Sequence, residues 1–574
     1  MESAKWVFGW IGRQKWRVVV SCFLLLLGVG LMMVEPFIFK SIVDDVIMKG
    51  EYERLLPLLL AALAFAVGNL TVKYVNTIFW EISSQEIVYG LRSELFKRIM
   101  AQPQKFFREN TSGDLITKCT GDVDMVRHFI CWVIPSAVES AFMIITVLVI
   151  FLAINPIYAL CLFVLTPVTA ILAYLLGRKI RPAHNEVREQ RAALSTVVNE
   201  NISGTRVVKA FVREDFEMDK FMKENHGYRD SQLKVNAVWL KYNPFIEGVS
   251  QVLNAVNLVV GGVLVILTPL TLGEMQIFLA LAWALNQPMV NMSMIINDAQ
   301  RFFAACEKLM YLYYRHNDIA SPEKPAETGE VRGGIKFDDV SLTLNGAKIL
   351  HGIDLEIKPG QTVGFMGPTG SGKTMLASLI PRFADVSRGS VTVDGIDVRK
   401  YDLTQLRGAV GLTMQDVFLF SASVENNVAY GKPDAPLEEI VAASVAADAD
   451  SFVSKMQEGY STIVGERGTG LSGGQKQRIS LARALLPSPP ILILDDTTSA
   501  VDMETEQYIQ SQLKALPKRS TTLIIAQRVS SIKHADMIYI MDGGRIAERG
   551  THEELMKLKG YYYETCMLQQ GGAA

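Results

Sequence analysis

Six long apolar stretches dominate about the first 300 residues of this 574-residue chain. A hydrocarbon layer about 30 Å thick is crossed by about 20 apolar residues of helix, and each stretch is long enough. A backbone inside such a layer must satisfy its own hydrogen bonds, so we expect membrane-spanning helices. The predicted spans are residues 17–40, 55–80, 129–153, 157–177, 243–268 and 274–299.

The composition agrees with a membrane protein, since the mean hydropathy is +0.21 and 49% of residues are hydrophobic. A net charge of -2 argues against a nucleic-acid partner, which would call for a strongly basic surface. The six cysteines lie far apart without a CxxC pair. We therefore expect buried, reduced thiols and neither a zinc site nor a disulfide framework.

The connections between the spans indicate the orientation of the chain. Two gaps, 153–156 and 268–273, are short and carry no Lys or Arg, whereas the long segments 81–127 and 178–241 carry seven and thirteen. The positive-inside rule places the long segments and both termini in the cytoplasm, which predicts a multi-pass protein of the cell membrane. The first apolar run is too long for a cleaved signal, so it should remain in the mature protein.

Both long segments carry apolar residues at helical spacing, which predicts spans that extend well beyond the bilayer. Each contains an interruption at its far end, near residues 106–116 and 210–217. Such a break either faces a partner or is an ordinary solvated turn.

Polar side chains inside the predicted spans either face a water-filled pathway or join helices by hydrogen bonds. Lys73 and Glu35 have a third possibility, because their charged ends could reach the membrane surface. The full set is Glu35, Asn69, Lys73, Glu139, Glu247, Asn254, Asn257, Asn286, Asn291 and Asn297.

The composition changes after about residue 315, where short β-rich runs begin to alternate with helical segments. This pattern predicts an α/β domain around a mostly buried sheet. We divide the chain into a transmembrane domain (1–315), a linker (316–335) rich in polar residues, Pro and Gly, and a nucleotide-binding domain (336–574). The predicted fold class is a six-helix membrane bundle joined to an α/β P-loop domain.

The sequence GPTGSGKT follows the predicted strand QTVGFM and precedes a helical run, which is the context of a phosphate-binding loop. Its glycines allow backbone N–H groups to point at phosphates, Lys373 would meet the β- and γ-phosphates, and Thr374 would offer a hydroxyl to Mg²⁺. The loop comprises Gly367, Pro368, Thr369, Gly370, Ser371, Gly372, Lys373 and Thr374.

The apolar run ILILDD ends in two aspartates. A carboxylate at the end of a buried strand beside a phosphate loop is suited to hold Mg²⁺, which we assign to Asp495. Asp496 follows where a base would orient the attacking water. Between the loop and this strand lies LSGGQ, formed by Leu471, Ser472, Gly473, Gly474 and Gln475, whose backbone amides open a helix toward an anion.

Together these motifs resemble the ATP-binding cassette (ABC) family over essentially the whole chain, in the arrangement of an exporter half-transporter. The resemblance implies ATP and Mg²⁺ as ligands, with Mg²⁺ held by Thr374, Gln415 and Asp495. Gln415 resembles the family's Q-loop, and residues 499–502, which end at Asp502, resemble its D-loop. Two cassettes of this family close head to tail, so each ATP lies between one phosphate loop and the other cassette's LSGGQ. The interruptions at 106–116 and 210–217 would then be its coupling helices.

Three positions depart from the family pattern, and all are on the phosphate-loop side of the site. Asp496 stands where the family has a catalytic Glu, Gln527 where it has a His, and Leu344 where an aromatic side chain stacks on adenine. Asp is one methylene shorter than Glu, so its carboxylate falls about 1.5 Å short of the water. Gln527 has no ionisable ring. Loss of the aromatic would weaken base binding by about 1 to 3 kcal/mol.

The departures are confined to the side of the site that would act on the attacking water and the adenine, because the family pattern is kept at Lys373, Thr374, Asp495 and LSGGQ. The pattern resembles the degenerate-site subunit of heterodimeric bacterial multidrug exporters, which implies a second half-transporter chain and a small amphipathic cargo moved across the bilayer. The alternatives are a homodimeric lipid or peptide exporter with slow ATPase activity, and an ATP-gated channel or regulator.

Overall fold

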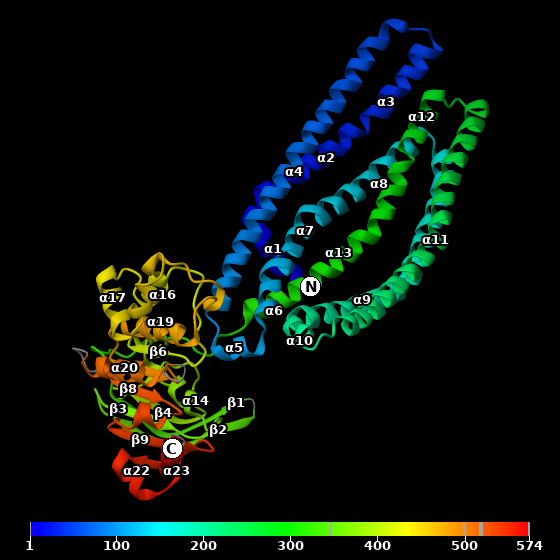
Figure 1. The fold of residues 1–574 in the computed structure, drawn as a ribbon. Coiled ribbons are helices and arrows are strands. Elements are labelled where there is room, and N and C mark those ends of the chain that lie inside the picture. The colour runs from blue at the N-terminus through cyan, green and yellow to red at the C-terminus, as the bar shows by residue number, and fades with distance from the viewer. Residues whose placement is uncertain (1, 345, 498–500, 516–519, 572–574) are drawn as a thin grey trace. The chain divides into compact units, whose positions relative to one another are not determined.

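The chain forms two compact units, and the computed structural model describes residues 2–344, 346–497, 501–515 and 520–571 (Figure 1). The first unit comprises Met1–Met100 and Ser112–Arg315, and the second comprises Ala101–Thr111 and His316–Ala574. The short segment 101–111 therefore groups with the second unit, although the sequence on both sides of it belongs to the first.

The described part of the first unit contains helices and no strands. The longest are α4 (Leu55–Met100), α9 (Pro156–Ser203) and α11 (Glu214–Leu267), with 46, 48 and 54 residues. At 1.5 Å per residue each is about 70 to 80 Å long. The prediction of helices that extend well beyond a bilayer is confirmed. The other main helices are α2 (Lys15–Met32), α3 (Val34–Ser41), α8 (Ile134–Ile154), α12 (Leu272–Leu281) and α13 (Trp283–Tyr314).

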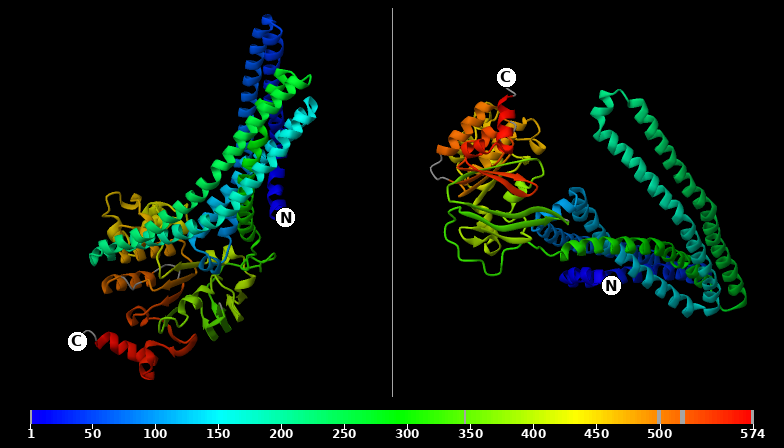
Figure 2. Two further views of the ribbon diagram at one scale, coloured as in Figure 1. Left: turned by 90° about the vertical axis from the view of Figure 1, so that its right-hand side faces the viewer. Right: turned by 90° about the horizontal axis from the view of Figure 1, so that it is seen from below.

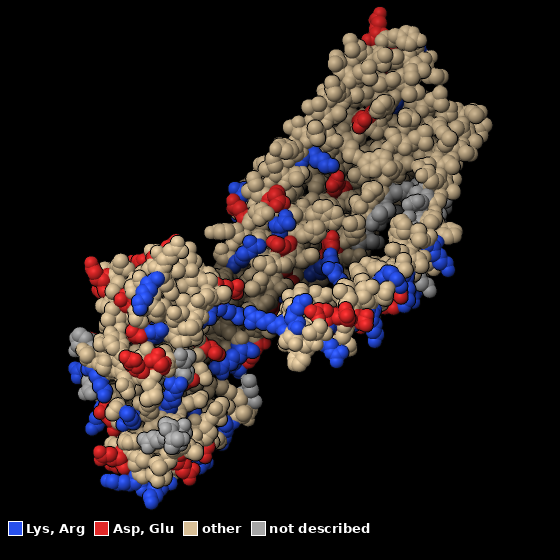
Figure 3. Space-filling model, viewed as in Figure 1, with Lys and Arg blue, Asp and Glu red and all other residues tan. Residues whose placement is uncertain are grey.

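The first unit exposes apolar side chains as a membrane protein does. Along α4, Leu56, Leu63 and Leu70 are each more than 60% exposed, so they face the surroundings and not a protein core. Among the described residues, the helical segments Lys5–Met48, Tyr52–Met100 and Ser112–Ile154 are long and apolar enough to cross a membrane. Figure 3 shows the end of this unit near α3 with few charges, while Lys, Arg, Asp and Glu gather around α10 (Thr205–Ala210).

The two short gaps predicted between spans are turns with clear caps. α9 begins at Pro156, where the Asn155 side chain accepts hydrogen bonds from the backbone N–H groups of Ile157 and Tyr158. At the other turn, Thr271 and Glu274 form a capping box on α12. Asp44, in the π-helix η2 (Ile42–Met48), accepts hydrogen bonds from the Thr271 hydroxyl at 2.7 Å and the Gly273 N–H at 2.8 Å. These bonds fix α12 to the end of the first predicted span.

A buried cluster of the first unit lies where α2, α8, α9, α12 and α13 meet, and α11 packs against it. α9 and α11 lie side by side along their length (Figure 2). Phe278 stacks on Phe151 and on Tyr158, with ring centroids 4.2 and 4.0 Å apart. Asn257 is fully buried, accepts a hydrogen bond from the Tyr158 hydroxyl and donates one to the Phe278 carbonyl at 3.1 Å. Asn257 therefore joins helices.

The second unit is an α/β domain with two sheets, which confirms the α/β part of the predicted fold class. A six-stranded sheet has the order β10 (Arg545–Gly550), β9 (Met537–Asp542), β3 (Thr362–Met366), β8 (Thr521–Ile525), β7 (Ile491–Asp495) and β6 (Val410–Thr413). All its pairings are parallel except β10 with β9. An antiparallel sheet has the order β2 (Ala347–Ile357), β1 (Ile335–Leu344), β4 (Arg388–Val393) and β5 (Ile396–Asp397).

Helices complete the second unit around these sheets. α14 (Lys373–Ser378) follows β3, and α16 (Val424–Val428), α17 (Leu437–Ala446) and α19 (Gly473–Leu485) share a separate hydrophobic cluster. α20 (Met503–Ala515) follows β7, and α22 (His552–Leu558) and α23 (Tyr561–Gly571) close the chain. The carboxyl ends of β3, β6, β7 and β8 lie on one edge of the sheet, which is where the site forms.

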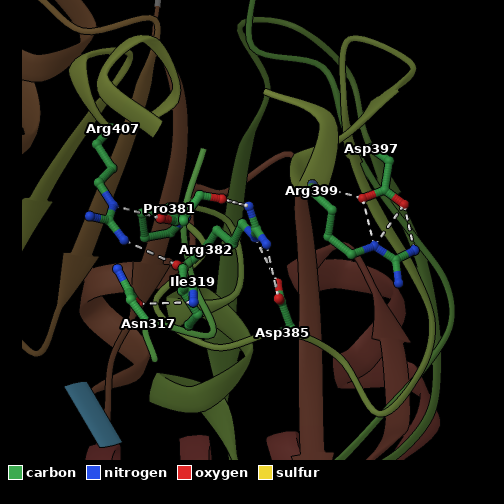
Figure 4. Close-up of polar contacts among 9 residues, drawn as sticks. Asn317, Ile319, Pro381, Arg382, Asp385, Asp397, Arg399 and Arg407 are labelled. Atoms are coloured by element: carbon green, nitrogen blue, oxygen red, sulfur yellow. Dashed lines mark hydrogen bonds and ion pairs between the residues drawn. The ribbon is translucent and has the colours of Figure 1, made fainter. Parts of the chain in front are cut away.

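The segment that enters the second unit is held by an arginine cluster (Figure 4). Asn317 donates to the Ala101 carbonyl at 2.6 Å and accepts from the Ile319 N–H at 3.0 Å. Arg382, only 6% exposed, donates twice to Asp385 and once to the Ala320 carbonyl. The start of the predicted linker is therefore an ordered part of this unit.

The six cysteines are free thiols in this structure. Cys306 and Cys566 are buried, whereas the other four are half-buried, so the expectation of burial is wrong for those four. In the described parts of the chain, no three His, Cys, Asp or Glu side chains are grouped as a metal site.

Candidate functional site

The loop between β3 and α14 has a backbone that only glycine allows at two positions. Gly367 has φ +140°, and a Cβ there would lie 2.0 Å from the Met541 carbonyl oxygen. Gly372 has φ +97°, and a Cβ there would lie 2.8 Å from the Leu350 side chain. Both positions combine a left-handed conformation with close packing, so neither accepts a side chain without rearrangement.

Lys373 is held by oxygen atoms of its own loop. Its Nζ donates hydrogen bonds to the carbonyls of Gly367 and Pro368, both at 2.8 Å, and to the Ser371 hydroxyl at 3.1 Å. Burial lowers the pKa of Lys373, and the nearby charges of Asp495 and Asp496 oppose this shift. The loop therefore presents an ammonium group already oriented beside the phosphate-binding backbone.

A cavity of about 320 Å³ joins this loop to the ends of three neighbouring strands. The structure places nine of the predicted site residues on its lining, six of them outside the glycine-rich turn of the loop: Lys373, Thr374, Gln415, Asp495, Asp496 and Gln527. The loop residues Thr369, Gly370 and Gly372 also line it. Side chains more than 150 residues apart in sequence thus meet because parallel strands end at the same edge of the sheet.

Asp495 ends the fully buried strand β7 and is 5% exposed. Burial raises the pKa of its carboxyl, whereas a hydrogen bond with Thr374 and the charge of Lys373 lower it. A carboxylate, a hydroxyl and the Gln415 amide oxygen on one cavity are hard oxygen donors of the kind Mg²⁺ prefers. This donor set fits the magnesium ion that the sequence predicts.

Asp496 has a left-handed backbone with φ +50°. Its N–H donates to the Ile525 carbonyl at 2.8 Å, and its carbonyl accepts from the Gln477 side chain at 3.3 Å. Asp and Asn adopt this conformation more readily than other side chains. The backbone therefore suits the short carboxylate that occupies the place of the family's Glu.

Gln527 follows β8 and is exposed on the cavity side of the sheet. Its backbone carbonyl accepts a hydrogen bond from Gln569 of α23 at 2.9 Å. The amide of Gln527 can donate a hydrogen bond into the cavity but cannot take up a proton at neutral pH. Two of the three departures from the family pattern, Asp496 and Gln527, thus share one cavity with Lys373.

The LSGGQ residues form the start of α19. The Ser472 hydroxyl accepts from the Gln475 N–H at 3.3 Å, and the Gln475 side chain accepts from the Ser472 N–H at 2.9 Å. Ser472 and Gly473 are exposed, and none of the residues 471–475 lines the 320 Å³ cavity. The motif is well formed and accessible, and it is separate from this chain's own phosphate loop.

Two further predicted residues lie away from this cavity. Asp502 caps α20, since its carboxylate accepts from the backbone N–H of Thr505 at 2.9 Å, and that hydrogen bond holds the pKa of Asp502 below its usual value. Leu344 ends β1 and lines a different cavity, while Ile349 of β2 lines the 320 Å³ cavity. Their assigned roles stay predictions. Ser499 and Ala500 of the predicted D-loop lie outside the described residues.

The cavity that contains Leu344 has a volume of about 100 Å³ and is also lined by α5 (Gln104–Glu109), from the first predicted interruption. Phe106 of this helix is 1% exposed, and the Arg108 guanidinium lies 3.9 Å from the Met375 sulfur. Met375 follows Thr374 directly and lines both cavities. This link could not be predicted from the sequence, because a methionine in a short apolar run has no distinguishing pattern.

The second interruption is the turn between α10 and α11, in the first unit. Phe211, Val212 and Phe216 are 73%, 80% and 60% exposed, and Val212 has φ +51°. Lys209 and Glu214 form an ion pair across the turn at 2.9 Å. A rigid turn that exposes three large apolar side chains is suited to contact another protein.

Comparisons with known proteins match both units. The family description "ABC transporter transmembrane region" matches residues 18–289, and the description "ABC transporter" matches residues 350–499. The ATP-dependent lipid A-core flippase of Desulfotalea psychrophila is 34% identical over 563 residues, covering 98% of each chain. YgaD of Bacillus subtilis, named as a candidate multidrug export ATP-binding/permease protein, is 33% identical over 97% of each chain. Among solved structures, a bacterial Atm1-family ABC exporter with ATP bound superposes with a TM-score of 0.82 at 26% identity, covering 97% of this chain and 98% of the other.

Proposed function

The chain belongs to the ABC transporter family as an exporter half-transporter, and from this premise we propose that it exports amphipathic, apolar compounds as one half of a heterodimer. In this proposal its own ATP site binds nucleotide but hydrolyses it poorly. Its LSGGQ motif completes the competent site of the partner chain.

One observation carries the proposal: Asp496 and Gln527 line the same cavity as the intact Lys373, Thr374 and Asp495. The residues that bind phosphate are therefore complete, and the residues that position water and share a proton in the reaction are altered. A carboxylate about 1.5 Å short of its water loses most of its effect as a base. Binding without efficient hydrolysis is the expected result.

The geometry of LSGGQ supports the assignment of the competent site to a partner. Its capping box is formed by side chains of this chain alone, and Ser472 and Gly473 are exposed. An accessible helix start with free backbone N–H groups can contact the γ-phosphate of an ATP bound to another cassette.

The residues around Met375 provide a route from nucleotide to the membrane helices. Met375 lines both the 320 Å³ cavity, where we propose that nucleotide binds, and the cavity lined by α5, and α5 follows α4 of the first unit in sequence. A shift of α14 on ATP binding would move α5 and, through it, the spans. The exposed apolar turn at Phe211 and Val212 would contact the partner chain.

Magnesium fits the oxygen donors of Thr374, Gln415 and Asp495. When bound, it neutralises charge on the β- and γ-phosphates. The protein's own residues do the remaining work: the loop backbone and Lys373 bind the phosphates, and Asp495 orients Thr374 through their hydrogen bond.

The test compares the ATPase activity of the purified chain with that of the chain together with a candidate partner half-transporter that carries the family's Glu and His. The lone chain should be nearly inactive and the pair active. In the pair, Asp496→Asn should leave turnover nearly unchanged, whereas Ser472→Arg should abolish most of it. Vigorous hydrolysis by the lone chain, or the opposite ranking of the two variants, would overturn the heterodimer.

A lipid is a second candidate cargo, because one relative is named a lipid A-core flippase. ATP-driven flux of fluorescent lipid and of amphipathic drugs, measured separately in reconstituted vesicles, decides between them. A complex that moves neither cargo against a gradient would favour a channel or regulator instead.

A further inference from the structure

A cavity of about 270 Å³ in the first unit has walls of two kinds. α2 contributes an apolar wall that includes Leu25 and Val29. α4 contributes a polar face, with Asn69, Lys73, Asn76 and Trp80 at intervals of three and four residues. The third wall comes from η5 (Phe129–Val133) and α8. The cavity therefore matches a molecule that has a polar and an apolar part.

The polar walls carry one charge of each sign, Lys73 on α4 and Glu139 on α8. Neither forms an ion pair with any residue that the structure describes. Charged side chains inside predicted spans are expensive and are retained where they meet a partner, a pathway or a ligand.

Two neutral polar groups on α4 also lack partners. Trp80 is only 3% exposed, and its indole N–H has no hydrogen-bond acceptor; the amide oxygen of Asn76 is buried without a donor. Buried polar groups are nearly always satisfied, so an unsatisfied donor and acceptor on one cavity wall indicate a polar ligand.

The position of the cavity along α4 is informative. Lys73 lies 18 residues after the start of α4 at Leu55, which is about 27 Å along the helix. With the predicted orientation this is near the cytoplasmic boundary of a hydrocarbon core about 30 Å thick. Head groups of amphiphiles in the inner leaflet lie near this boundary, and Trp132 and Trp80, which is about 10 Å further along α4, suit the interfacial region beside it.

We propose that this cavity binds the head group of a zwitterionic amphiphile, with its anionic group on Lys73 and its cationic group on Glu139. The indole rings of Trp80 and Trp132 would favour the same cation, and the apolar wall of α2 would contact the start of the tail. This assignment rests on the proposed export of amphipathic compounds and names the class of cargo.

A ligand with a single charge would satisfy one of the two side chains and leave the other unpaired in a largely apolar setting, which is unfavourable. The competing explanation is that Lys73 and Glu139 pair with each other in another conformation of the transporter. In that case the cavity would show no preference among head groups.

The test measures binding of three amphiphiles of equal tail length to the full-length chain in nonionic detergent, by native mass spectrometry without ATP. The probes are a zwitterionic lysophosphatidylcholine, an anionic lysophosphatidic acid and a cationic alkyltrimethylammonium. We expect the zwitterion to bind about tenfold more tightly than either other probe. Lys73→Met and Glu139→Gln should each remove about tenfold of its affinity, as expected for a charge-assisted contact.

Matched controls come from the same unit: Lys97→Met on α4 and Glu35→Gln on α3 remove equivalent charges outside the cavity and should change nothing. The exchanged pair K73E/E139K keeps both charges and should restore the zwitterion's affinity to within about threefold. Its recovery would also show that the single variants lost binding through charge and not through misfolding.

The proposal is overturned if the wild-type chain prefers the anionic or the cationic probe, or binds all three equally. It is also overturned if the neutral K73M/E139Q variant binds the zwitterion as tightly as the wild-type chain does. These outcomes are separate from failure of the proposed function. If the head-group preference is absent but ATP-driven flux of amphiphiles persists, only this assignment is wrong; if flux is absent, the export function itself is wrong.

Discussion

Replacing Asp496 by Glu tests the central argument, because it adds the one methylene that the site lacks. The cavity of about 320 Å³ has room for it. A misplacement of about 1 Å slows a reaction by about 10²-fold. Because Glu brings the carboxylate within reach of the water, the rate of ATP hydrolysis should rise by about this factor. That gain corresponds to about 2.7 kcal/mol of the activation barrier.

The expected gain appears in the chain alone, since two copies closed head to tail would pair each repaired phosphate-loop side with an intact LSGGQ. The assay is steady-state ATP hydrolysis by the full-length chain, at concentrations where light scattering shows a dimer. Adding Gln527→His to the same chain should raise the rate further by supplying an ionisable ring.

The substitution also has a structural effect that can be measured separately. Asp496 has φ +50°, where Glu is less favourable than Asp by about 1 kcal/mol. The melting temperature of the second unit should fall by roughly 2 to 4 °C. Asp496→Gln is the matched control, because Gln has the length of Glu and the same backbone strain but no basic carboxylate.

The reasoning is refuted if Asp496→Glu and Asp496→Gln hydrolyse ATP at the wild-type rate while ATP affinity and dimer content are unchanged. The carboxylate's reach would then not be what limits the reaction.

Three further perturbations follow from individual contacts. Burial raises the pKa of Asp495, so the ionised carboxylate destabilises the fold as pH rises through that pKa. Asp495→Asn should therefore raise the melting temperature at neutral pH but not in acid. The same variant should abolish magnesium-dependent ATP binding in a titration. Arg382→Ala removes three hydrogen bonds of a buried guanidinium and should lower the free energy of unfolding by about 2 kcal/mol. The melting temperature should fall by roughly 4 to 8 °C, whereas an unchanged melting temperature would mean that water replaces these hydrogen bonds. Phe106→Ala should leave ATP affinity within about twofold but reduce cargo flux in vesicles, because it truncates the buried side chain of α5; equal loss of both would indicate unfolding of the unit.

The elements that the sequence predicted correctly are those with strong local signals. ILILD is an unbroken apolar run, and β7 is buried at all five positions. The short gaps at residues 153–156 and 268–273 contain Asn155 and Thr271, whose side chains cap the following helices. In each case the information lies within a few consecutive residues.

The features that were not predicted depend on packing between distant segments. β2 has no clear strand signal in the sequence, because its pairing with β1 contains register shifts and Gly352 has φ +56°, which interrupts the alternation of buried and exposed residues. The grouping of 101–111 with the second unit and the place of Met375 between two cavities are tertiary contacts. The sequence also cannot distinguish the roles of the polar residues in the spans. Asn257 joins helices, whereas Lys73 and Glu139 line a cavity, and this difference depends on how the helices pack.

The proposed function separates nucleotide binding from hydrolysis in one cassette, and the geometry of the site supports this separation. The binding loop is constrained by the fold, since Gly367 packs against the Met541 carbonyl and a change there would disturb the sheet itself. Asp496 and Gln527 have side chains on the cavity, and the left-handed backbone at Asp496 accommodates Asp without rearrangement. Under the proposed function, substitutions at these two positions would alter the chemistry at little cost to folding. An ATP site that binds well and reacts slowly would then be a stable outcome for this architecture and not a sign of general decay.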